Sequence, residues 1–306
     1  MNYKFIYFIF LIFSFSAYTQ EDEKEKNTQP EIKEYEFKEV SKAELKQKYH
    51  PKDSLAPAAI IYEKGDVNFA YSEGWEYTRE VTKRIKIYSK DGYDYANIKI
   101  PYYYPNVNKH KENIISVKAR TYNLRNGKVV DERVRKRDMI DVEKTDKYKI
   151  LKFTFPKVEP GSVIEYTYTL VSPHISRLND WSFQHDIPTD QSVYKISVPE
   201  AFGYSERAKG YHQIFKEEGS HRSNMKLTYE GAGLRTNTGY QNLIFKDYTY
   251  YAKDVSKMKD EPFVNNQENF LTSINHELAF VKNMNTNEVK YLTKSWKDVA
   301  LNFYDN

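Results

Sequence analysis

The strongest constraint on the fold is a two-residue alternation of apolar and polar side chains, clearest between residues 75 and 87. The apolar members share one parity: Trp75, Tyr77, Val81, Ile85 and Ile87. Charged and hydroxyl side chains fill the other parity. Successive side chains of a β-strand point to opposite faces, so this pattern predicts a long strand with one buried face.

The alternation recurs along the chain between turn signals. Further strands are expected at 58–62, 67–71, 96–100, 115–121, 151–155, 162–172, 193–198, 225–229 and 243–251. Turns are expected at 64–66 (Lys-Gly-Asp), 90–92 (Lys-Asp-Gly), 126–127 (Asn-Gly), 160–161 (Pro-Gly) and 231–233 (Gly-Ala-Gly). The 28 Tyr and 17 Phe agree with this reading, because aromatic side chains favour strands. The chain is therefore predicted to be all-β, an antiparallel β-sandwich of many strands.

The first 19 residues have the features of a signal peptide. Lys4 gives a positive end, residues 5–13 are apolar and aromatic, and residues 14–19 are small and polar. Ala17 and Thr19 stand three residues and one residue before Gln20, which is the pattern that a signal peptidase reads. The apolar run is much shorter than the ~20 residues that cross a bilayer, although an uncleaved anchor is an alternative. We expect export, with a periplasmic or cell-envelope location.

The rest of the chain divides by composition. Residues 20–50 are charge-dense and are expected to be a largely disordered tether, with a short helix where Ser41 and Glu44 form a capping box. Residues 51–251 are the predicted sandwich, and 252–294 a polar connector with one last strand. Ser295 opens a second capping box, so residues 295–306 are expected to begin a helix of a second, truncated domain.

Composition also limits the chemistry. The chain has no Cys, which excludes disulfides, thiolate metal sites and a cysteine nucleophile within these 306 residues. The net charge is +4 with basic and acidic residues interleaved, which is typical of a soluble surface and gives little reason to expect nucleic acid as a partner. No serine-hydrolase elbow, phosphate-binding glycine loop or dinucleotide fingerprint occurs. We expect no catalytic residue, cofactor site or metal site.

The seven histidines offer the remaining route to an active site, yet none lies three or four residues from another. His185 is followed by Asp186, but neighbouring residues of a strand point to opposite faces, so a structural role for His185 is expected. A hydrolase site assembled in space would require a pocket that brings His185 or His276 together with two carboxylates.

Two surfaces are candidates for binding. Stacking on sugars would use an exposed aromatic strip made of these rings: Trp75, Tyr102, Tyr103, Tyr104 and Trp181. The densest basic cluster, within residues 133–137, would contact an anionic polymer. Acidic residues surround that cluster, so a solvated loop or edge strand is the alternative reading.

A set of short strings carries a family resemblance. The strings are FTFPKVEPGSVIEY at 153–166, SP at 172–173, WSFQ at 181–184, IP at 187–188, EPF at 261–263 and INHEL at 274–278. Together they resemble the uncharacterised β-rich domain that precedes the transglutaminase-like, papain-like core in exported bacterial proteins of the transglutaminase superfamily. The resemblance spans about residues 55–300.

The resemblance implies an N-terminal sandwich followed by a core with a Cys-His-Asp triad. This chain ends near where that core would begin and has no Cys, so no catalytic residue is carried over. We therefore expect a non-catalytic exported accessory or binding domain, whose partner is a transglutaminase-like domain or an envelope polymer or protein. Two alternatives stay open: a stand-alone carbohydrate- or peptidoglycan-binding sandwich, and a fragment of a transglutaminase-like cysteine peptidase or transferase.

Overall fold

The computed structural model divides into two compact units, Met1–Glu31 and Ile32–Asn306. The structure describes residues 32–292 except 34, 73, 106–109, 231–235, 260–265 and 284–285. The predicted signal peptide, the start of the predicted tether, the 231–233 turn, the EPF string and the predicted helix from residue 295 lie outside the described residues.

Strands make up most of the second unit, which confirms the all-β prediction. The strands are β1 (Ala58–Ser72), β2 (Trp75–Ile87), β3 (Asn97–Tyr103), β4 (Asn113–Arg125), β5 (Lys128–Arg133), β6 (Ile140–Thr145), β7 (Tyr148–Thr154), β8 (Val163–Ser172), β9 (Arg177–Ser182), β10 (Thr189–Pro199), β11 (Phe202–Lys209), β12 (Phe215–Glu230), β13 (Thr236–Val255), β14 (Ser273–Lys282) and β15 (Val289–Tyr291). The helices are α1 (Lys42–Lys46) and three 3₁₀ segments, η1 (Lys90–Ala96), η2 (Lys136–Asp138) and η3 (Gln267–Phe270).

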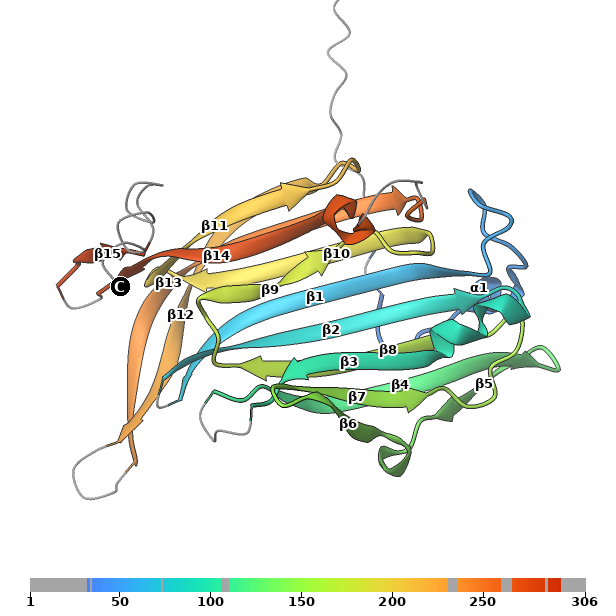
Figure 1. Cartoon of the computed structure of the whole chain (residues 1–306), viewed down its shortest axis with the longest axis horizontal. Coiled ribbons are helices and arrows are strands. Elements are labelled where there is room, and N and C mark those ends of the chain that lie inside the picture. The colour runs from blue at the N-terminus through green and yellow to red at the C-terminus, as the bar shows by residue number, and fades with distance from the viewer. Residues whose placement is uncertain are drawn as a thin grey trace, which may run out of the picture. The chain divides into compact units, whose positions relative to one another are not determined.

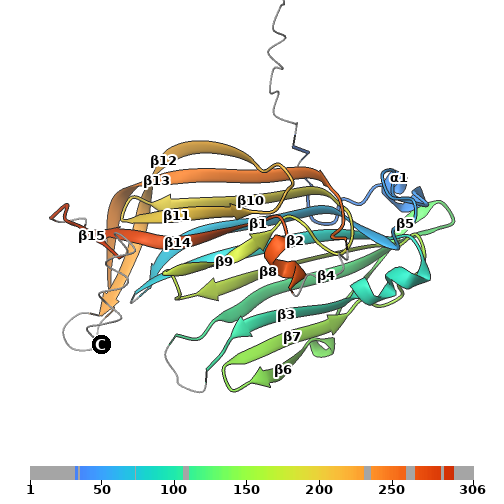
Figure 2. The ribbon, with the colours of Figure 1, turned by 45° about the horizontal axis from the view of Figure 1, so that its top comes forward.

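The strands form three sheets (Figure 1). The main sheet has eight strands in the order β10-β13-β12-β1-β2-β8-β4-β5, and β10 also pairs in parallel with β1. The β3 sheet has the order β3-β7-β6. The β14 sheet has the order β11-β14-β15, with β9 also paired to β14. Figure 2 shows the β3 sheet and the β14 sheet as two separate groups of strands.

Both small sheets cover the same face of the main sheet, which makes the molecule a sandwich. Ile85 of β2 packs with Ile98 of the β3 sheet in one apolar core. Tyr77 of the same strand packs with Trp181 and Ile274 of the β14 sheet in a second core. Residues 77 and 85 share a parity, so the two cores lie on one face of β2. We call this the inner face of the main sheet.

Residues 32–48 pack against the opposite, outer face. Val40 and Leu45 are buried against Ile61 and Val163, and the ring of Tyr35 stacks on Tyr62 at 4.8 Å. The later part of the predicted tether is therefore held on the sheet, because its few apolar side chains cover apolar surface of the outer face. The predicted capping box between Ser41 and Glu44 is confirmed.

Two of the predicted turns are corrected. β1 runs unbroken through the Lys-Gly-Asp at 64–66. A Cβ on Gly65 would lie 2.6 Å from the ring of Trp181, so this glycine permits a close approach rather than a turn. The Lys-Asp-Gly at 90–92 begins η1, which carries the chain from the main sheet into the β3 sheet. The Asn126-Gly127 hairpin between β4 and β5 is confirmed, with positive φ at both residues.

Candidate functional site

The predicted aromatic residues lie in separate surroundings. Trp181 and Tyr102 are buried, at 3% and 7% exposure, and Trp181 stacks on Tyr194. Trp75, Tyr103 and Tyr104 are half-buried. The five rings therefore form no single exposed strip, and a binding role for the three half-buried rings stays a prediction.

A polar cleft opens on the inner face where the two cores meet. Its volume is about 230 Å³, and its lining includes Glu63, Lys83, Tyr166, Trp181 and His185. Tyr166 belongs to the core under the β3 sheet, whereas Trp181 belongs to the core under the β14 sheet. The cleft therefore marks the seam between the two halves of the sandwich.

Strand register places the charged groups of this seam. Glu63 of β1 stands opposite Lys83 of β2 on one side and Ser192 of β10 on the other. A register shift between Ile60 and Tyr62 changes which residues of β1 face inward, so Glu63 joins the inner face together with Val67. His185 precedes β10 and reaches the same carboxylate.

The carboxylate of Glu63 is saturated with donors. Lys83 Nζ lies 2.7 Å from Oε2, while His185 Nε2 and Ser192 Oγ lie 2.9 and 2.7 Å from Oε1. Ser192 Oγ in turn accepts a hydrogen bond from Trp181 Nε1 at 3.0 Å. The side chain of Glu63 is only 1% exposed, so nearly all of its interactions are with these groups.

The surroundings of Glu63 also decide its protonation. Burial alone would raise the pKa of its carboxyl, but the interactions with His185 and Lys83 outweigh burial and lower the pKa to about 2. Glu63 therefore stays ionised near neutral pH, where it acts as a fixed negative charge.

The other charged residues that line the cleft are Arg79 and Asp180. The guanidinium of Arg79 lies 5.2 Å from the Trp181 ring centroid, and its Nη1 donates to the carbonyl oxygen of Asn179. An oxygen of Asp180 lies 3.6 Å from Arg177. The cleft thus brings His185 together with two carboxylates, the arrangement that a spatially assembled hydrolase site requires.

Comparison with known proteins shows the family. Residues 75–230, about half of the chain, match the family model of DUF3857, described as a domain of unknown function with a solved structure. The chain belongs to this family. The match to DUF3857 includes Lys83, His185 and Ser192 of the seam and leaves Glu63 outside it. No curated protein matches the chain.

One solved structure similar to this DUF3857 chain is that of a "putative protease" from Parabacteroides distasonis. The TM-score is 0.53 at 15% sequence identity, which supports a shared fold. The likeness covers 73% of this chain and 41% of that protein, so this chain spans about two fifths of its length.

His276 is more deeply buried than His185 in the DUF3857 chain and has a different environment. His276 Nε2 lies 3.2 Å from the hydroxyl of Tyr250, which donates to Glu206. Burial lowers the pKa of His276 to about 4, so it is neutral at pH 7. Asp186 accepts a hydrogen bond from the hydroxyl of Tyr95 at 2.9 Å.

Within the described ranges, no group of three or more His, Asp or Glu side chains is placed to bind a metal ion. The same part of the chain has no helix that is long and apolar enough to cross a membrane.

Sequence reasoning missed the seam, although β2 carried a signal for it. Lys83 and Arg79 fall on the same parity as Val81 and Ile85, which is the buried parity. A charged side chain in a buried register needs a partner of opposite charge, so Lys83 indicated an unidentified carboxylate. Its identity, Glu63, depends on the register between β1 and β2.

Proposed function

We propose that this chain is the exported, non-catalytic accessory domain of a longer protein, in which it precedes a transglutaminase-like, papain-like core. Three observations support the proposal. The strings between residues 153 and 278 resemble such a domain, and the chain belongs to a family of unknown function. The similar Parabacteroides distasonis protein is far longer and is called a "putative protease".

The observation that carries the non-catalytic assignment is that three side-chain donors already bind the buried carboxylate of Glu63. A general acid or base must exchange a proton near the working pH. Glu63 is buried with three donors and its pKa is held at about 2, so it cannot serve in that role. Its bond to His185 also occupies Nε2 of the histidine, and the cluster instead neutralises charge at the seam between the two cores.

The proposed location is the periplasm or the cell envelope. Its support is the N-terminal run with Lys4, the apolar residues 5–13 and the small residues before Gln20. A partner in that compartment is the core itself or an envelope polymer or protein. Expression with the native N-terminus, followed by mass measurement of the exported product, should give a chain that begins at Gln20. A full-length product retained in the cytoplasm would contradict the location.

A direct assay tests the assignment. We expect the purified chain to release no product from envelope peptides or peptidoglycan, and to join no amine to glutamine-containing peptides. A longer protein that carries the core should show turnover under the same conditions. Turnover by the 306-residue chain alone would contradict the proposal.

A second candidate is a hydrolase that uses the seam cleft, favoured by the presence of His185, Glu63 and Asp180 in one pocket. In that reading Glu63 orients His185 as a general base. Any turnover by the isolated chain should then disappear in His185→Ala and persist in a variant of an exposed histidine, His221→Ala. Turnover unaffected by His185→Ala would contradict this candidate.

A further inference from the structure

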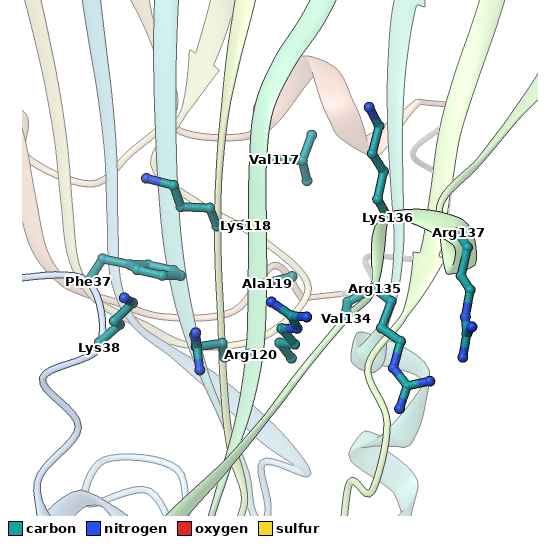
Figure 3. A pocket seen from close by; sticks show the side chains of 11 residues that line it. Phe37, Lys38, Val117, Lys118, Ala119, Arg120, Val134, Arg135, Lys136 and Arg137 are labelled. Carbon is teal, nitrogen blue, oxygen red and sulfur yellow. The ribbon is translucent and has the colours of Figure 1, made fainter.

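A basic pocket lies on the surface beside β4 and the last residue of β5, at the end of β5 that is farther from the Asn126-Gly127 hairpin. Its volume is about 460 Å³. Three segments form it: residues 37–38 of the N-terminal segment, residues 117–120 of β4, and residues 133–137 at the end of β5 and in η2 (Figure 3). The basic cluster noted in the sequence is therefore one wall of a concave site.

Local backbone structure builds the pocket floor. Pairing of β4 with β8 shifts register between Ile115 and Lys118, and Ser116 has a positive φ of 57°. The shift is a bulge, which turns the following residues of β4 toward the end of β5. Val134 N donates to the carbonyl oxygen of Ala119 at 3.0 Å and fixes the two walls together.

The charge of the pocket is uniformly positive. Its basic members are Lys38, Lys118, Arg120, Arg133, Arg135, Lys136 and Arg137, and no acidic residue among those that the structure describes lines it. Arg120 forms an ion pair with Asp131, and Arg137 lies 3.8 Å from Asp138. The other five have no ion pair with any residue that the structure describes.

Like charges gathered in a concave surface repel one another and focus a positive potential there. A protein gains by binding a counter-charge at such a place, and five unpaired cations exceed the charge of a single phosphate group. Arginine predominates on the wall of residues 133–137, and its planar guanidinium matches the oxygens of phosphate in a bidentate manner. Phe37, Val117 and Val134 add apolar surface for the carbon part of a ligand.

We propose that this pocket binds a small anionic molecule, of lipid head-group size, that carries at least two phosphate groups. The volume of the pocket falls in the range of small-ligand sites, which favours a compact ligand over a long polymer. This inference rests on the proposed function, because it names the class of envelope ligand that the accessory domain holds.

The N-terminal segment completes the site. Phe37 and Lys38 line one side of the pocket, and the backbone N–H of Lys38 donates to the buried carboxylate of Glu165 at 2.8 Å. Arg84 holds the neighbouring carbonyl oxygens of Glu36 and Glu39. The ligand and the docked segment should therefore stabilise each other.

Titration calorimetry with the purified chain and pyrophosphate, at low and at moderate salt, tests the inference. We expect saturable binding that weakens as salt rises. The double variant Arg133→Gln/Arg135→Gln should bind about tenfold or more weakly, since it loses two charge-assisted contacts. The matched control Arg207→Gln/Arg222→Gln removes two exposed arginines outside the pocket and should bind like the unaltered chain.

Vesicles identify the source of the ligand. If the chain sediments with phosphatidylcholine vesicles that contain a bisphosphorylated lipid, and not with phosphatidylcholine alone, the ligand is a membrane head group. Binding to pyrophosphate without such sedimentation reports a soluble ligand, and either result supports the pocket.

Three outcomes would overturn the inference: no binding of either probe, equal binding by the pocket variant and its control, or a preference for single-stranded DNA over both. Circular dichroism melting shows that the variants are folded. Hydrolytic activity of the chain would refute the proposed function and leave the binding result intact, so the two failures are distinguishable.

Discussion

Two buried ion clusters, one on each face of the main sheet, are built from neighbouring residues of β2. Lys83 points to the inner face and binds Glu63 in the seam. Arg84 points to the outer face, is 1% exposed, and binds both Glu165 and Glu44. Adjacent residues of one strand thus serve opposite faces, as the alternation of side chains requires.

The two clusters differ in the groups that bind their central charge. The carboxylate of Glu63 is bound by three side chains and lies beside an open cleft. The guanidinium of Arg84 also binds the main-chain carbonyl oxygens of Glu36 and Glu39, so it fastens residues 36–44 to the sheet. The inner cluster therefore joins two parts of the core, whereas the outer cluster holds a segment that would otherwise be free.

The largest effect should come from breaking the outer cluster. Arg84→Ala leaves the carboxylate of Glu165 buried without its partner, which should cost about 3 to 5 kcal/mol of unfolding free energy. Urea denaturation measures the loss, and limited proteolysis should show new cleavage within residues 36–46. The control Arg125→Ala breaks an exposed pair with Glu159 and should cost less than about 1 kcal/mol. Equal losses of unfolding free energy in the two variants would contradict the role of Arg84 in holding residues 36–44 on the sheet.

Acid should break the inner cluster selectively. Glu63 has a pKa of about 2 in the fold and an ordinary value of 4.5, so its stabilisation is complete above pH 4.5 and is lost as pH falls toward 2. At about 1.4 kcal/mol per pKa unit, the loss is about 3 kcal/mol.

The variant Glu63→Gln isolates that contribution. Its unfolding free energy, measured by urea denaturation at several pH values, should depend less on pH between 4.5 and 2 than that of the unaltered chain. The control Glu277→Gln changes an exposed carboxylate and should keep the original slope. A Glu63→Gln variant with the original slope would show that Glu63 is not held ionised.

At alkaline pH, stability should instead depend on a buried lysine of the outer face. Lys86 is buried there, with Nζ donating to the carbonyl oxygens of Leu45 and Gly161, and burial lowers its pKa to about 8. The folded chain then releases this proton at lower pH than the unfolded chain, so the contribution of Lys86 to stability should rise between pH 8 and 10 by roughly 1 to 2 kcal/mol.

Lys86→Met should remove that rise in urea denaturation, whereas Lys290→Met, on the surface, should retain it. The tyrosines of the unfolded chain ionise over the same pH range in every variant, so the difference between the unaltered chain and Lys86→Met isolates the contribution of Lys86. The same dependence of stability on pH in these two chains would contradict the assignment.

The smallest effect should come from one donor of the inner cluster. Ser192→Ala removes one hydrogen bond to Glu63 and the acceptor of Trp181 Nε1, at a cost of about 1 kcal/mol. The emission of Trp181 should also change, because its indole N–H loses its partner. Ser197→Ala on the same strand removes a bond to Asp247 near the surface and should leave the tryptophan emission unchanged. An unchanged emission in Ser192→Ala would contradict the contact.

The sequence alone was sufficient for several strands, β2 among them, and for one hairpin. The alternation in residues 75–87 and the Asn126-Gly127 pair are local features, and both appear in the structure as predicted. The prediction of a turn at residues 64–66 was wrong. Gly65 is needed there because the ring of Trp181, more than a hundred residues away in sequence, leaves no room for a Cβ. A residue whose neighbour is distant in sequence carries no local signal of that neighbour.

What the sequence determined by itself is therefore the fold class, since side-chain alternation and turn chemistry depend on a few adjacent residues. Tertiary structure alone decided that both faces of β2 are covered near residues 83–86, that Glu63 meets His185, and that residues 37–38 reach the basic wall at 133–137. The physical reason is that ion pairs and pockets depend on which strands become neighbours. That choice follows from burying all the apolar surface of the chain at once.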